Sequence, residues 1–147
     1  MQVRPAPHDA TVLLREIRAV SAAFEARLAG ELTVNPTDLV AMENLIEDGP
    51  LTPTDLATRL GVTTAAITTS IDRLTALGHV TRTPNPADRR GVLVVPTPES
   101  SRRAMASILP MVSGIDRVLD DFDDSQRAVI VDYLEKVIAA YREHLPG

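Results

Sequence analysis

The feature of this sequence that most restricts its fold is a pair of short helices separated by only a glycine and a valine. Thr52-Pro53 begins the first helix, because threonine can cap it and proline needs no partner for an N–H at the first position. This helix ends at Leu60, Gly61-Val62 permits a tight turn, and Thr63 caps a second helix that extends to Leu77. Two helices joined by a short turn containing glycine predict a helix-turn-helix.

The second helix of this pair has two different faces. Ile67, Ile71 and Leu74 follow the helical period and are expected to point inward. The opposite face is small and rich in hydroxyl groups, and it comprises Ala65, Thr68, Thr69, Asp72 and Ala76, with Arg73 at its edge. Such a face fits a DNA major groove, where threonine can bond base edges or phosphates and methyl groups can meet thymine methyls. The alternative is a merely solvated face, but solvated faces usually carry Glu and Lys.

The start of the same helix and the segment after it add to this hypothesis. Free N–H groups at Thr63-Thr64 could receive a phosphate. Two strand candidates, His79–Thr83 and Val92–Val95, then flank the turn-rich connector Pro84–Gly91 and predict a hairpin with a long, basic tip.

Two arginines in this connector are the candidate minor-groove contacts. Arg89 and Arg90 lie on a loop that is stiffened by prolines, and an arginine held in this way suits the narrow, electronegative minor groove. Asp88 is expected to pair with Arg90 and fix its direction. An ordinary exposed turn is the alternative, since charge at hairpin tips is common.

The charge of the chain is unevenly distributed. The net charge is −5, yet the stretch from Arg59 to Arg103 carries seven arginines and only three acids. A basic segment inside an acidic chain predicts one face for a polyanion and other faces for solvent or a protein partner.

Helices are expected on both sides of this basic segment, over Asp9–Gly30, Pro36–Asp48 and Pro98–Asp121, the last with a kink at Pro110. A further apolar stripe follows from Ile130 to Leu145. The predicted fold class is therefore mainly α with a small β-hairpin wing. Apolar stripes at both ends of the chain, far from each other in sequence, are most easily buried by a second copy of the chain. The acidic run 120–125 is expected to cap a helix in a turn and to bind no metal.

The order of these motifs resembles the MarR (multiple antibiotic resistance regulator) family of winged helix-turn-helix regulators. The residues that carry the resemblance are Leu51-Thr52-Pro53, Leu56-Ala57, Leu60-Gly61-Val62-Thr63, Asp72-Arg73-Leu74, Leu77-Gly78, Asp88-Arg89-Arg90-Gly91-Val92-Leu93-Val94 and Thr97-Pro98-Glu99. The chain departs from the family at Thr69, where relatives often carry a long polar residue, at Pro96 in a strand position, and at Ser100-Ser101.

The resemblance implies a homodimer that binds pseudo-palindromic double-stranded DNA, typically as a repressor that a small anionic or phenolic ligand releases. It implies dimerisation helices over 1–34 and 98–147 and a winged helix-turn-helix over 35–97. Arg73 would lie near a phosphate and Arg90 at the wing tip. The predicted DNA-binding residues are Thr63, Thr64, Ala65, Thr68, Thr69, Arg73, Arg89 and Arg90, with Asp88 as wing support.

Other classes of protein find less support in the sequence. It has no cysteine, no nucleophile elbow, no phosphate-binding glycine loop and no His-Glu-x-x-His helix, and His8, His79 and His144 are scattered. We therefore expect no enzyme activity, no cofactor and no metal. The alternative within this fold is a winged-helix protein-interaction module without operator binding. With neither a signal peptide nor a membrane span in the sequence, the expected location is the cytoplasm.

Overall fold

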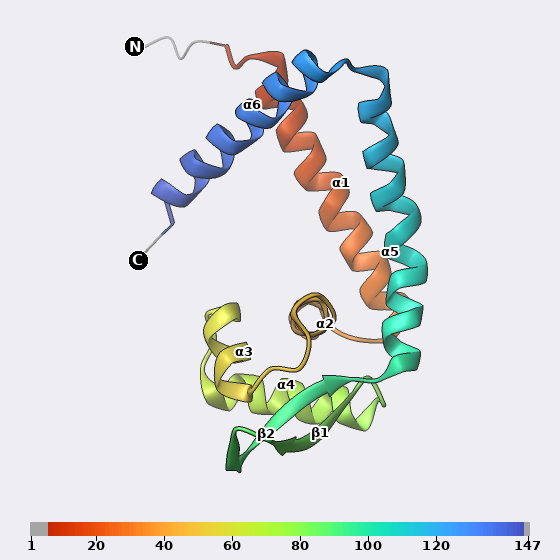
Figure 1. Ribbon diagram of the computed structural model, residues 1–147, viewed down its shortest axis with the longest axis vertical. Helices are drawn as coiled ribbons and strands as arrows, with labels where there is room; N and C mark the ends of the chain where they lie inside the picture. The colour runs from red at the N-terminus through yellow and green to blue at the C-terminus, as the bar shows by residue number, and fades with distance from the viewer. Residues whose placement is uncertain (1–5, 146–147) are drawn as a thin grey trace. The chain divides into compact units, whose positions relative to one another are not determined.

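A computed structural model of the chain describes residues 6–145 (Figure 1). Residues 1–5 and 146–147, which belong to the predicted terminal regions, lie outside the described part. The described elements are α1 (Asp9–Leu32), α2 (Pro36–Asp48), α3 (Pro53–Leu60), α4 (Thr64–Ala76), β1 (Val80–Asn85), β2 (Asp88–Pro96), α5 (Pro98–Val118), the short 3₁₀ helix η1 (Leu119–Asp121) and α6 (Asp124–Glu143). The predicted class, mainly helical with one hairpin, is confirmed.

The chain divides into two compact units within α5. The first unit ends at Met105 and the second begins at Ala106. The first therefore contains the whole helix-turn-helix and the hairpin together with α1 and the first turns of α5.

α2 and α3 begin at the residues that their capping side chains predicted. Asn35 Oδ1 accepts a hydrogen bond from the N–H of Asp38 at 2.8 Å, and Thr52 Oγ1 accepts one from Asp55 at 3.1 Å. Each side chain satisfies an N–H group that the first turn of a helix leaves without a partner. The proline that follows each cap loses no hydrogen bond there, and the predicted bounds of α2 and α3 are confirmed.

The core of the first unit lies where α2, α3 and α4 meet the hairpin. Its fully buried side chains come from each of these elements and from the end of α1, and include Leu28, Leu32, Met42, Leu45, Leu56, Ile67, Ile71, Leu74, Val80 and Val94. In Figure 1 the two strands lie along α4, which also packs against α3 and α2. The hairpin thus covers one flank of α4, and this packing fixes the position of the second helix of the helix-turn-helix.

Two glycines shape the ends of the paired helices. Gly61 and Gly78 have φ angles of 64° and 77°, in the left-handed region that side chains with a Cβ rarely adopt. Gly61 ends α3, and Gly78 follows the C-cap Leu77 of α4. The turn at Gly61-Val62 and the stop at Gly78 were both expected from the sequence and are confirmed.

The hairpin differs from its prediction. The expected long connector Pro84–Gly91 is instead mostly strand, because β1 continues to Asn85 and β2 begins at Asp88. Pro84 is accommodated beside a register irregularity between residues 84 and 85, where the ladder shifts. Leu51 also forms an antiparallel bridge to Val94, so β2 is paired along both of its edges.

The second unit holds the remainder of α5, η1 and α6. α5 continues through Pro110 up to Val118. The acidic run caps α6, as expected: Asp123 Oδ1 accepts from the N–H of Gln126, and Gln126 Oε1 accepts from the N–H of Asp123, both at 2.9 Å. α6 has no buried residue. None of the helices over residues 6–145 combines the length and the apolar character that crossing a membrane requires.

Candidate nucleic-acid interface

The two faces of α4 are divided as the sequence predicted. Ile67, Ile71 and Leu74 are buried, whereas the opposite face is exposed at Ala65, Thr68, Thr69, Asp72 and Ala76. Thr68 Oγ1 donates to the carbonyl of Thr64 at 2.8 Å, and Thr69 Oγ1 donates to that of Ala65 at 3.1 Å. Both hydroxyl protons are therefore used inside the helix.

Thr63 is the N-cap of α4. Its Oγ1 accepts from the N–H of Ala66 at 3.1 Å, so the side chain of Thr63 is a helix cap. Thr64 and Ala65, the first two residues of the helix, are exposed beside it.

Arg73 forms an ion pair with a buried carboxylate on α2. Its Nε donates to Asp38 Oδ2 at 2.9 Å and its Nη2 to Asp38 Oδ1 at 2.7 Å, while Ser70 Oγ donates to the same Oδ1. Burial alone would raise the pKa of Asp38, but the hydrogen bonds from Arg73 and Ser70, with the charge of Arg73, hold it below its ordinary value. The side chain of Arg73 is 45% exposed. One part of its guanidinium thus fastens α4 to α2 while another part reaches the surface.

Asp72, the one acid of α4, is paired with the hairpin. Arg82 Nη2 on β1 lies 2.5 Å from Asp72 Oδ1, and Arg82 Nη1 lies 3.4 Å from the hydroxyl of Thr75. The pair ties the exposed side of α4 to the wing strand, and it neutralises the one carboxylate on the exposed face of α4.

The wing tip is a two-residue turn fixed by side chains on either side of it. Asn85 Oδ1 accepts from the N–H of Ala87, and Asp88 Oδ1 accepts from the N–H of Arg90, both at 3.0 Å. Asp88 therefore supports the wing through the backbone of Arg90, whereas the sequence suggested a bond to its side chain. Arg89 and Arg90 are both exposed at the start of β2.

A buried histidine joins the base of the wing to two helices. The ring of His79 is 3% exposed, with Nε2 2.8 Å from the carbonyl of Leu32 and Nδ1 2.7 Å from the hydroxyl of Ser100. Arg103 of α5 adds a bond from Nη2 to the carbonyl of Glu31. The carbonyls at the end of α1, which the helix itself leaves without partners, are thus bound by residues that precede and follow the hairpin.

Three acids gather where α1 meets α2. Burial raises the pKa of Glu43, and the charges of Glu25 and Glu47 raise it further. Glu43 therefore opposes the compact state when it is ionised.

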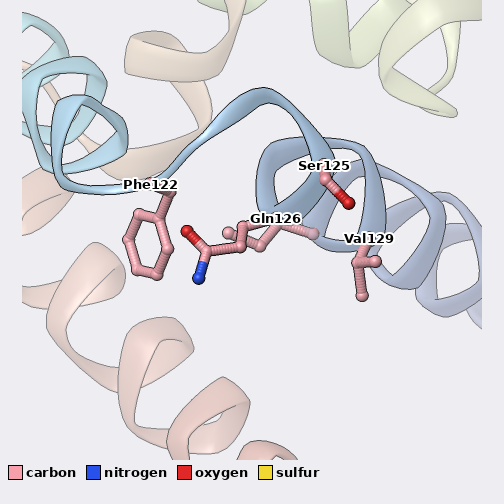
Figure 2. Close-up of a pocket in the computed structure, with 5 residues that line it drawn as sticks. Phe122, Ser125, Gln126 and Val129 are labelled. Carbon is pink, nitrogen blue, oxygen red and sulfur yellow. The ribbon is translucent and has the colours of Figure 1, made fainter.

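The second unit carries a shallow apolar hollow of about 310 Å³ at the turn into α6, lined by Phe122, Ser125, Gln126, Val129 and Ile130. Figure 2 shows the ring of Phe122 beside the side chain of Gln126, with Val129 one turn further along α6. Neither a cationic nor an anionic side chain lines it, so it is a continuation of the exposed apolar surface of this unit.

Comparison with known proteins finds the same motifs in one family. Residues 32–91, from the end of α1 into β2, match the sequence model of the MarR family. The HTH-type transcriptional regulator YcgE of Bacillus subtilis is 28% identical over 136 residues, which span 92% of this chain and 88% of that protein. The part of the chain that holds α2, α3, α4 and most of the hairpin thus has the sequence pattern of the MarR family. Over nearly its whole length the chain is similar to transcription regulators, and its α4 and hairpin correspond to the recognition helix and the wing of a winged helix-turn-helix.

Further similar proteins carry the same family name or fold. The multiple antibiotic resistance protein MarR of Salmonella typhimurium is 45% identical over 53 residues, 36% of this chain and 37% of that protein. Transcriptional regulator Tm0710 of Thermotoga maritima superposes with a TM-score of 0.65 at 26% identity, covering 93% of this chain and 96% of that one. Apo MarR of Escherichia coli superposes with a TM-score of 0.62 at 22% identity over 91% and 98% of the two chains, which supports the fold.

Sequence reasoning missed three residues of this region, namely Asp38, Ser70 and Arg82. Asp38 lies in the first turn of α2, where an acid is common because it favours the positive end of the helix. The buried Met42 and Leu45 follow it by four and seven residues, and this helical spacing was the available signal that Asp38 points inward. Arg82 offered no such local signal, because its partner Asp72 lies ten residues earlier in another element.

Proposed function

We propose that this protein binds operator DNA as a homodimer, with α4 in the major groove and the wing in the adjacent minor groove. The observation that carries the proposal is the arrangement of charge around α4. Asp72 and Arg73, its two charged residues, are paired with Arg82 and Asp38, so the exposed face is left small and nearly neutral. A helix with such a face can approach base edges closely.

The wing supplies the cations that the exposed face of α4 does not. Arg89 and Arg90 are exposed beside a turn that Asn85 and Asp88 hold in place. A guanidinium on a fixed turn loses little conformational freedom on entering a narrow minor groove, whose potential attracts it. Thr64 and the helix N-terminus would contact a phosphate, and the exposed part of Arg73 would contact another.

A second copy of the chain is proposed to cover the exposed apolar surfaces. On α1, Leu13, Ile17 and Val20 each expose more than half of their surface area. In the second unit, Ile115, Val129 and Tyr141 are exposed by at least half of their area. Apolar surface of this extent needs a partner. Two-fold symmetry would place two recognition helices about 34 Å apart, on successive major grooves of a pseudo-palindromic site.

Repression and release by a small anionic or phenolic ligand are the finer parts of the proposal, and both rest on the similarity to the MarR family. The HTH-type transcriptional repressor YetL of Bacillus subtilis is 32% identical over 88 residues, 60% of this chain and 53% of that protein, which supports repression. Such a regulator would act in the cytoplasm, where its DNA lies.

The test is binding of the full-length protein to the DNA upstream of its own gene, across a series of salt concentrations. A DNA-binding regulator loses affinity steeply as salt rises, because bound phosphates release counterions. Arg90→Ala should weaken binding by at least about tenfold, the size of one charge-assisted contact, with unchanged thermal stability. Arg142→Ala, in the last turn of α6, is the matched control and should leave affinity unchanged. Absence of any salt-dependent DNA binding would favour a protein-interaction module. Adding simple aromatic acids to the same assay tests ligand release.

A further inference from the structure

We infer that α4 reads thymine methyl groups, so that the operator half-site of this protein is defined by thymines in the major groove and not by guanines. This inference rests on the proposed function and names the kind of sequence that it requires. The place of α4 in the helix-turn-helix makes it the reading element, and its hydrogen bonds determine which chemical groups it can offer.

The first step concerns the donors that read guanine and adenine. Guanine is usually read by the paired N–H groups of arginine, or by lysine, and adenine by asparagine or glutamine. α4 contains no lysine, asparagine or glutamine. Its one arginine, Arg73, uses Nε and Nη2 on Asp38. The side-on pair of N–H groups is therefore unavailable for the edge of a guanine.

The second step concerns the threonine hydroxyls. Thr68 and Thr69 donate their hydroxyl protons to the carbonyls of Thr64 and Ala65, four residues earlier. Each hydroxyl lies against the helix backbone, which leaves the methyl group as the branch of the side chain that can face outward. Ala65, on the same face, adds another methyl group.

The third step is the match with the bases. In the major groove, thymine is the only standard base that presents a methyl group, and alanine or threonine methyls pack against it. A face composed of methyl groups, with its charges neutralised by Asp38 and Arg82, gains by excluding water from thymine methyls. It offers little to a guanine edge, whose two acceptors would lose water and find no matching pair of donors.

The experiment begins with selection of tight-binding sites from a pool of random duplexes by the full-length protein. Each thymine of one half-site in the selected duplex is then replaced by deoxyuridine, which lacks only the methyl group. We expect at least one replacement to weaken binding about fourfold, the effect of one buried methyl-sized group. Thr68→Ser or Thr69→Ser, which keeps the hydroxyl bond, should remove that difference between thymine and uracil, and the corresponding valine variant should keep it.

Thr58 provides the matched control. It is an exposed threonine on α3, and its Oγ1 donates to the carbonyl of Thr54 at 3.0 Å in the same way. Thr58→Ser should leave the thymine preference intact. Equal affinity for thymine and uracil at every position, or a selected half-site without thymines, would overturn the inference while operator binding stands. Failure to enrich any duplex would instead refute the proposed function, and this inference with it.

Discussion

Arg82 on the wing strand β1 holds Asp72 on α4, with 2.5 Å between Nη2 and Oδ1. The two residues belong to the two elements that are proposed to enter neighbouring grooves. The pair therefore has two roles: it fixes the hairpin against the helix, and it cancels a negative charge on the face that is proposed to meet DNA.

This relationship predicts a specific pattern in a double-mutant cycle. Arg82→Met should weaken DNA binding by more than about tenfold, because it leaves the carboxylate of Asp72 unpaired near phosphates. Asp72→Asn in the same chain should restore most of the loss. The measurement is operator affinity at fixed salt for both single variants and the double variant. Purely additive losses would show that Arg82 contacts DNA independently of Asp72.

The buried carboxylate of Asp38 predicts an acid-dependent loss of stability. Its pKa is lower in the folded chain than in the unfolded chain, so its stabilising contribution is present above about pH 4 and is lost as the pH falls through its folded pKa. Asp38→Asn should lower the free energy of unfolding by roughly 1–3 kcal/mol at pH 7, as expected for a broken charged hydrogen-bond network.

Urea unfolding of the Asp38→Asn variant and the parent chain at a series of pH values measures this effect. The difference between the two proteins should shrink below about pH 4. Asp48→Asn, at the end of the same helix and exposed, serves as the control and should change stability little. A deficit that stayed constant down to pH 2 would mean that the charge of Asp38 is irrelevant to it.

Glu43 predicts a pH dependence of stability opposite in sign to that of Asp38. Its pKa is raised in the folded chain, so the ionised form destabilises the fold above that pKa, and the penalty disappears as protonation proceeds at lower pH. Glu43→Gln should therefore raise the Tm at pH 7, and this gain should fall towards zero near pH 4. Thermal unfolding monitored by circular dichroism checks both points. Glu16 is an exposed acid on α1, and the control variant Glu16→Gln should give no comparable gain in Tm.

The apolar surface of the second unit predicts the oligomeric state. A chain ending after Asp121 lacks α6, with Val129, Leu134 and Ile138 among the exposed apolar residues that are lost. Analytical ultracentrifugation should find the full chain as a dimer and the shortened chain as a monomer. A point variant, Ile138→Lys, makes the same test with α6 retained. A stable dimer in both cases would place the partner contact elsewhere.

Local signals determined how much of the fold could be predicted. α2 and α3 begin where predicted, because a capping side chain followed by proline acts within a single turn. The buried face of α4 follows from the period of Ile67, Ile71 and Leu74. The similarity to the MarR family could likewise be inferred from the order of helix, turn, helix and basic hairpin.

The parts that were missed depend on pairing across the chain. Proline, aspartate and glycine between residues 84 and 91 indicated a loop, yet cross-strand pairing extends both strands up to the two-residue turn. The bond between Arg73 and Asp38 joins residues 35 positions apart, and the sequence gives no distance between their helices. Threonine hydroxyls that bond to their own helix are equally invisible until the rotamer is known.

The ring of His79, the residue just before β1, is bonded to the last turn of α1 and to the first turn of α5. Three elements thus meet in one stiff joint, with a polar contact in each direction. Any rearrangement of either helix end would therefore have to break one of these two hydrogen bonds or carry the start of the hairpin with it.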